Sequence, residues 1–85
     1  MVWEVVWSEK SKKQLASVEK QIARRIRDRV LDIREDPYKA VKRLRRTNLY
    51  SLRVGNYRVI LNLMRGKMVI FVVSASNRGH VYDRL

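Results

Sequence analysis

The spacing of apolar residues changes from a helical to a strand period near the middle of the chain, and this change limits the fold more than any other feature. The first half carries a stripe of apolar residues at helical spacing, namely Val18, Ile22, Ala23, Ile26, Val30 and Ile33. After Pro37, apolar and polar residues alternate over Leu49–Val54 and again over Tyr57–Met64, as they do in strands. The sequence therefore predicts an α+β protein, with helices before the main strands.

The first 37 residues predict one strand followed by two helices. Val2–Trp7 is rich in Val and Trp, which favour strands. Ser8 is suited to cap a first helix that ends near Ala16, and Ser17 is suited to cap a second. Pro37 is expected to close the second helix, because the residue before a proline is pushed out of the α region. Two antiparallel helices joined by a tight turn are the simplest arrangement.

The second half predicts a meander of three antiparallel strands. Gly55-Asn56 is a two-residue hairpin signal between the two alternating segments, and Arg65-Gly66 marks a second tight turn. Lys67–Ser74 is the third expected strand, and its unbroken apolar core is typical of a central strand covered on both faces. The predicted order is β-α-α-β-β-β, in a single domain over residues 1–85.

Composition excludes several classes of site. The chain has 85 residues and no cysteine, so it can form neither a disulfide nor a thiolate metal site. It shows no glycine-rich phosphate loop, no paired carboxylates at catalytic spacing and no clustered metal ligands, and we expect no metal or cofactor. The longest apolar run, Met68–Val73, is too short to cross a bilayer, and the N-terminus lacks a signal-peptide pattern. We therefore expect a soluble cytoplasmic protein without a membrane partner.

Positive charge is concentrated in the second half. Residues 37–82 contain ten Lys or Arg residues and no Asp or Glu, so they supply +10 of the net charge of +12. Residues 1–36 carry nine basic and seven acidic side chains, a net charge of +2. Such an excess attracts polyanions, and nucleic acid is the leading candidate. The alternative is a basic surface that only keeps a small protein soluble.

The predicted hairpin places two arginines opposite each other. If Gly55 and Asn56 are the loop residues, Arg53 faces Arg58 across the two strands. Like charges so placed are destabilising unless an anion joins them, and the planar fork of arginine suits a phosphate. In the alternative interpretation, both side chains splay into water.

Further candidates lie in the C-terminal tail and in a basic run before the hairpin. His80 is the only histidine, and it is either a proton-transfer group or a surface residue. Tyr82 can stack on a base or can pin the tail to the core. Arg78 follows the third strand of the meander. The basic run is expected to steer a phosphate backbone, and its cations are Lys42, Arg43, Arg45 and Arg46.

These residues resemble a known family. The segment Leu49–Ile60, with Lys42–Arg45 before it, resembles the signature of the RelE/ParE toxin superfamily. The tail Arg78–Tyr82 is similar to the C-terminal motif of its RelE branch, especially of the archaeal-type members. The likeness covers nearly the whole chain, because the length and the order of elements match as well. It implies a toxin of a type II toxin-antitoxin system with a RelE-like fold.

The resemblance also implies an activity and roles for individual residues. RelE toxins are ribosome-dependent endoribonucleases that cut mRNA in the A site through attack of a 2′-hydroxyl on the adjacent phosphate, without a metal. Arg58 corresponds to the arginine that stabilises the transition state, and Arg53 to a basic residue on the preceding strand. Arg78 corresponds to the arginine past the last strand, and Tyr82 to the tyrosine that stacks on a base. The implied partners are the ribosome, mRNA and a cognate RelB-like antitoxin.

One departure from the family leaves the proton chemistry open. Ser51 stands where many RelE proteins carry a lysine, and an arginine is a poor base because it stays protonated. His80 or a group elsewhere in the complex is then the candidate base. Two other functions stay open, a ParE-like toxin that inhibits DNA gyrase without catalysis and a cationic module that only binds nucleic acid.

Overall fold

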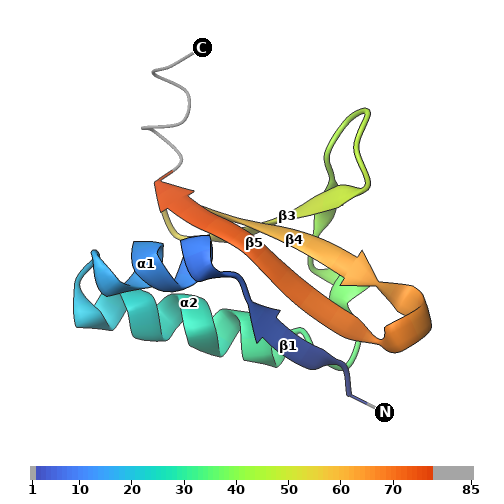
Figure 1. Ribbon diagram of the computed structural model, residues 1–85, viewed down its shortest axis with the longest axis horizontal. Coiled ribbons are helices and arrows are strands. Elements are labelled where there is room, and N and C mark those ends of the chain that lie inside the picture. The colour runs from blue at the N-terminus through green and yellow to red at the C-terminus, as the bar shows by residue number, and fades with distance from the viewer. Residues whose placement is uncertain (1, 78–85) are drawn as a thin grey trace.

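A five-stranded sheet with two helices packed against one of its faces makes up the protein (Figure 1). The computed structural model describes residues 2–77. The helices are α1 (Glu9–Ala16) and α2 (Lys20–Asp32). The strands are β1 (Glu4–Trp7), β2 (Lys42–Arg43), β3 (Leu49–Val54), β4 (Tyr57–Met64) and β5 (Val69–Asn77). Two short 3-10 helices are η1 (Pro37–Lys39) and η2 (Arg65–Lys67). In this part of the chain, no helix is long and apolar enough to cross a membrane.

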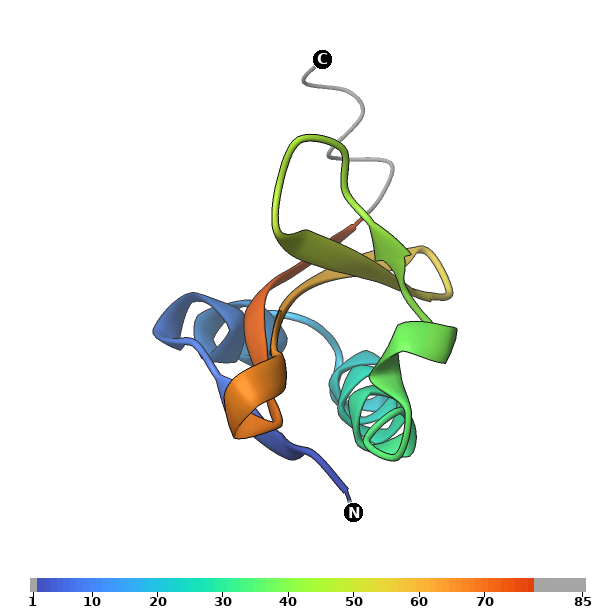
Figure 2. The ribbon, with the colours of Figure 1, turned by 90° about the vertical axis from the view of Figure 1, so that its right-hand side faces the viewer.

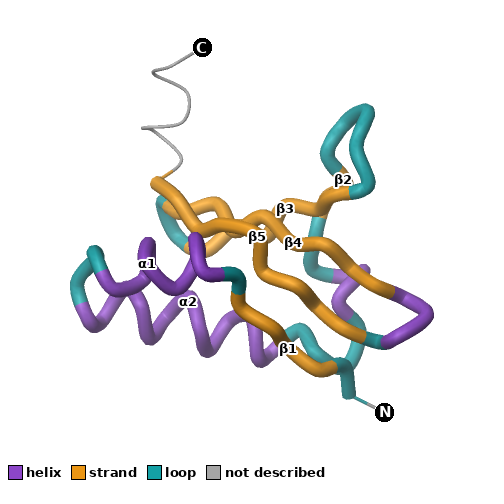
Figure 3. The backbone as a smooth tube through the Cα atoms, viewed as in Figure 1, coloured by secondary structure: helices purple, strands orange, loops and turns teal. Residues whose placement is uncertain are grey.

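The strands are ordered β1-β5-β4-β3-β2, and the sheet is mixed. The predicted antiparallel meander of β3, β4 and β5 is confirmed. The N-terminal strand β1 lies beside β5 (Figure 3), and the two strands pair in parallel. A parallel pair requires a long connection, which the two helices and three strands between β1 and β5 provide. The short edge strand β2 was not predicted.

The helix boundaries differ from the prediction at two points. Ser8 caps α1 as expected, and its side chain accepts a hydrogen bond from the Ser11 backbone N–H at 3.0 Å. Ser17 does not cap α2, because its hydroxyl donates to the Gln14 carbonyl at 2.8 Å and so closes α1. Helix α2 ends at Asp32 instead of near Pro37. Just past this end, the Trp3 backbone N–H donates a hydrogen bond to the Arg34 carbonyl at 2.9 Å, so the chain there pairs with the N-terminal segment.

The core lies between α2 and one face of the sheet. Alternate residues of β4 and β5 are buried against the apolar stripe of α2. On β5, Ile70 and Val72 are fully buried, whereas Val69, Phe71 and Val73 are only half-buried. The prediction of a strand covered on both faces is therefore wrong, because the helices cover one face of the sheet alone. The uncovered face carries the residues discussed below.

Side chains of α1 replace a missing strand beside the end of β5. Strand β1 stops at Trp7, so β5 has no strand neighbour on that side beyond Val72. Here Ser8 Oγ donates to the Val73 carbonyl at 2.7 Å, and the Ala75 backbone N–H donates to Gln14 Oε1, also at 2.7 Å. These two bonds satisfy backbone groups that would otherwise be buried without partners.

Gln14→Leu is expected to lower the free energy of unfolding by about 1–3 kcal/mol, because the buried Ala75 N–H loses its acceptor. Urea denaturation followed by circular dichroism measures the change. Ser17→Ala is the control, since it removes an exposed hydrogen bond and should cost less than about 0.5 kcal/mol. Equal losses in the two variants would contradict the role assigned to Gln14.

Candidate phosphate-binding site

The predicted pairing of Arg53 with Arg58 is confirmed by the register of β3 and β4. The neighbouring pair Leu52 and Val59 is buried against the helices, so the two arginines lie on the uncovered face of the sheet. Gly55 starts the connecting turn with a φ of 57°, a conformation that glycine adopts without strain. The turn residues thus fix the register that brings the two guanidinium groups to one face.

A cavity of about 490 Å³ lies on this face beside the arginine pair. It contains four cationic side chains and no acidic one, and its lining residues are Lys39, Ala40, Val41, Lys42, Ser51, Arg53 and Arg58. Lys42 on β2 is the cross-strand neighbour of Ser51 on β3, so the two residues lie side by side at the cavity. The four cations come from η1, β2, β3 and β4 and surround one cavity. Such a group of cations is suited to bind a phosphate.

Lys39 belongs to the cavity but was not among the predicted site residues. Lys39 is the last residue of η1 and lines the cavity, and the ring of its neighbour Tyr38 packs η1 against the rest of the molecule. That ring packs edge-on against Trp3 at 5.8 Å and against Tyr50 at 5.6 Å between centroids, and the Arg65 guanidinium lies 5.3 Å from its centroid. These contacts join distant parts of the chain, so no local pattern could have placed Lys39 beside Arg58.

The predicted basic run is divided among three environments. Lys42 lines the cavity, whereas the Arg43 Nε donates to the Thr47 carbonyl at 3.2 Å and steadies the loop between β2 and β3. Arg45 and Arg46 lie in that loop, which projects from the body of the molecule in Figure 2. Neither of them lines the cavity. The three predicted tail residues, Arg78, His80 and Tyr82, lie outside the described residues.

The described lining of the cavity limits its chemistry to charge stabilisation and proton exchange by lysine. Arginine stays protonated in proteins, whereas a lysine ammonium can give up a proton. Lys39 lies 4.0 Å from Asp36 in an exposed ion pair, and Lys42 has no such partner among residues 2–77. Within the same residues, no group of three His, Cys, Asp or Glu side chains could hold a metal ion.

Arg53→Gln is expected to raise the free energy of unfolding by about 0.2–1 kcal/mol at low salt, because it removes one of two like charges placed opposite each other. Inorganic phosphate should then stabilise the wild-type protein more than this variant. Urea denaturation with and without phosphate measures both effects. Arg45→Gln, which removes the same charge from the projecting loop, is the control. An equal rise in the free energy of unfolding in Arg45→Gln would contradict a local repulsion at Arg53.

Comparisons with known proteins agree with this architecture. Residues 5–82 match the model of the ParE toxin of type II toxin-antitoxin systems. The chain in the RelBE2 toxin-antitoxin complex of Mycobacterium tuberculosis is similar to this one with a TM-score of 0.85 and 18% identity, over 92% of this chain and 100% of that one. The isolated RelE toxin of E. coli gives a TM-score of 0.77 and 20% identity, over 96% and 93% of the two chains.

An archaeal relative is more similar in sequence. The chain in the RelE-RelB complex of Pyrococcus horikoshii has 28% identity and a TM-score of 0.80, over 93% of this chain and 98% of that one. No match was found among curated proteins. The match to the family model covers the helices, the sheet and the cationic cavity. The chain therefore belongs to the ParE toxin family of type II toxin-antitoxin systems, within the RelE/ParE superfamily, and it has the fold of RelE toxins.

Proposed function

We propose that this toxin is an endoribonuclease that inhibits translation in the cytoplasm by cutting mRNA in the ribosomal A site. The observation that carries the proposal is the cavity with four cations and no acid, two of whose cations are the paired Arg53 and Arg58. The planar forks of two guanidinium groups on one face of the sheet can donate hydrogen bonds to the oxygens of one phosphate. The 28% identity to an archaeal RelE over nearly the full length of both chains supports a RelE-like function.

In the proposed reaction, the 2′-oxygen of a ribose attacks the adjacent phosphorus while the bond from phosphorus to the 5′-oxygen breaks. The products are a 2′,3′-cyclic phosphate and a 5′-hydroxyl. Arg58 and Arg53 stabilise the negative charge that builds up on the phosphate oxygens. The Lys42 ammonium can supply the proton that the leaving 5′-oxygen takes up.

The tail residues keep the roles expected of them from the sequence, which for Arg78 and Tyr82 are those that the family resemblance implies. We propose Arg78 as a further cation at the phosphate, Tyr82 as the ring that stacks on a base, and His80 as a candidate acceptor of the 2′-hydroxyl proton. On this view, Arg45 and Arg46 contact RNA outside the cavity.

We also propose that a RelB-like antitoxin neutralises the toxin. Several of the similar structures are complexes of RelE with RelB. This chain has no Asp or Glu between residues 37 and 82, so that region carries a large net positive charge that favours an acidic partner. Antitoxin and RNA would then compete for the same cations.

Purified protein added to ribosomes programmed with mRNA tests the proposed activity. Cleavage is expected with ribosomes present and not with the same mRNA alone. The family model favours a second candidate, since it describes the ParE toxin, and the ParE-like alternative is inhibition of DNA gyrase without catalysis. Inhibition of gyrase supercoiling without RNA cleavage would replace the first proposal with the second. RNA binding with neither effect would leave a non-catalytic nucleic-acid-binding module.

A further inference from the structure

A second cavity lies away from the uncovered face of the sheet, between α2 and the turn of the β3–β4 hairpin. Its volume is about 620 Å³, and α2 lines one side of it while Arg53, Val54 and Gly55 line the other. None of the candidate residues from the sequence lies in it except Arg53, which also lines the first cavity. The two cavities are therefore adjacent and share one lining residue, Arg53.

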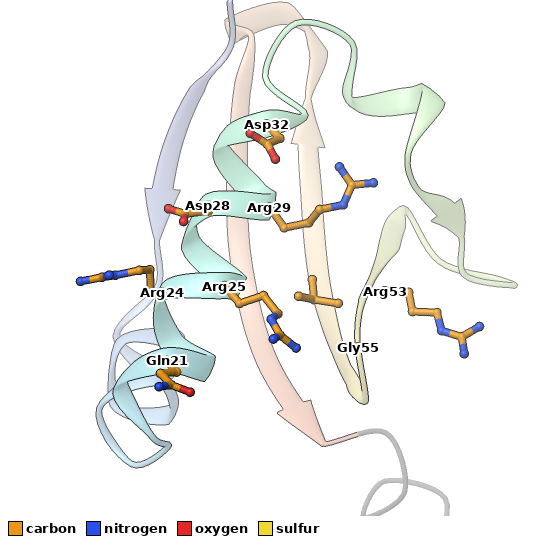
Figure 4. A pocket seen from close by; sticks show the side chains of 9 residues that line it. Gln21, Arg24, Arg25, Asp28, Arg29, Asp32, Arg53 and Gly55 are labelled. Atoms are coloured by element: carbon orange, nitrogen blue, oxygen red, sulfur yellow. The ribbon is translucent and has the colours of Figure 1, made fainter.

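Two arginines of α2 point into this groove. Figure 4 shows the side chains of Arg25 and Arg29 directed from α2 toward the hairpin, and that of Asp28 directed away from it. Arg25 and Arg29 are four residues apart, so they are neighbours on the helix surface and their like charges repel each other. Asp28 and Asp32 also line the groove, but neither forms an ion pair with these arginines among the described residues.

At the hairpin turn, the Arg25 side chain lies close to the backbone of Gly55. Arg25 Nη1 lies 3.7 Å from the place that a Cβ atom would occupy on Gly55. The guanidinium thus stands beside the turn that precedes Arg58. Arg25 and Arg29 are thus a pair of cations with no acidic side chain at ion-pair distance among the described residues, whereas the Arg53 side chain is directed away from α2 (Figure 4).

We propose that this groove between α2 and the hairpin is a second binding site for the phosphate groups of RNA, separate from the cavity where cleavage is proposed. The inference rests on the proposed function in one respect, namely that RNA is the partner. The planar forks of Arg25 and Arg29 suit phosphate oxygens, and the groove adjoins the first cavity, with which it shares the lining residue Arg53. A protein partner would need an apolar anchor, and Val54 is the only large apolar residue of this lining.

The experiment measures the affinity of the full chain for a short single-stranded RNA that carries a 2′-O-methyl group on every ribose and so cannot be cleaved. The double variant Arg25→Gln/Arg29→Gln is expected to bind about tenfold more weakly. The slope of log affinity against log salt concentration should fall by about 1.4, since each lost contact to a single-stranded phosphate removes about 0.7. The matched control is Lys20→Gln/Arg27→Gln, which removes the same charge from exposed positions of α2 outside the groove.

An equal loss of affinity in both double variants would overturn the inference, because it would reflect net charge alone. Unchanged affinity in Arg25→Gln/Arg29→Gln, or loss of antitoxin binding with RNA binding intact, would overturn it as well. Circular dichroism of both variants verifies that α2 is folded. The experiments distinguish failure of the groove proposal from failure of the cleavage proposal. If Arg25→Gln/Arg29→Gln weakens RNA binding but the wild-type protein cuts no mRNA, only the proposed enzymatic activity is rejected. If the wild-type protein cuts mRNA but this variant binds RNA normally, only the groove is rejected.

Discussion

Arg58→Ala is expected to reduce ribosome-dependent mRNA cleavage by a factor of about 10²–10³. Arg58 lies on β4 in the centre of the sheet, and the register holds it opposite Arg53 beside the cationic cavity. A cation fixed in advance at the position where charge develops needs no reorganisation during the reaction, and its removal leaves that charge uncompensated. The fold should be retained, because the side chain lies on the face of the sheet that the helices do not cover.

The controls separate loss of chemistry from loss of charge. Arg58→Lys keeps the positive charge but not the planar fork, so its cleavage rate should fall between those of the wild type and Arg58→Ala. Arg27→Ala removes an exposed arginine of α2 that lines none of the described cavities, and it should leave the rate unchanged. Rates are measured from the accumulation of cut mRNA on programmed ribosomes. Unimpaired cleavage by a folded Arg58→Ala protein would contradict the site.

Leu61→Ala is expected to lower the free energy of unfolding by about 2–5 kcal/mol. Leu61 is fully buried on β4, where it faces the apolar stripe of α2 through the shared core. Truncation removes the transfer free energy of the side chain and leaves a cavity. Small domains have total stabilities of about 5–15 kcal/mol, so this loss should produce a visible unfolded population in mild denaturant.

Leu31→Ala makes the same chemical change at a position of α2 that is 43% exposed. This substitution should lower the free energy of unfolding by no more than about 0.5 kcal/mol, because little apolar surface is buried at Leu31. Urea denaturation of both variants gives the comparison. Similar losses in the two variants would show that Leu61 does not pack in the core as described.

The hairpin was predictable because its determinants are local. Strict alternation on both sides of Gly55-Asn56 sets which side chains share a face, and the glycine takes the positive φ that a two-residue turn requires. The pairing of Arg53 with Arg58 follows from that register alone. The cap of α1 at Ser8 is local in the same way, since the acceptor and donor are three residues apart.

The parts that were not predicted depend on contacts between distant segments. Lys39 joins the cavity only because Tyr38 packs between Trp3 and Tyr50. Helix α2 ends at Asp32, before Pro37, and just past this end the Trp3 backbone N–H donates to the Arg34 carbonyl from a distant part of the chain. Likewise, an unbroken apolar run cannot reveal that helices cover only one face of β5. Such features require the tertiary structure.

The chemical identity of the cut RNA ends tests the proposed cleavage by paired cations most directly. Purified protein is added to ribosomes programmed with mRNA, and both new ends are characterised. Attack by the 2′-hydroxyl predicts a 2′,3′-cyclic phosphate on the upstream fragment and a 5′-hydroxyl on the downstream fragment, with the cut inside the codon in the A site. Fragments that carry a 3′-hydroxyl and a 5′-phosphate, or intact mRNA together with inhibited gyrase, would contradict it.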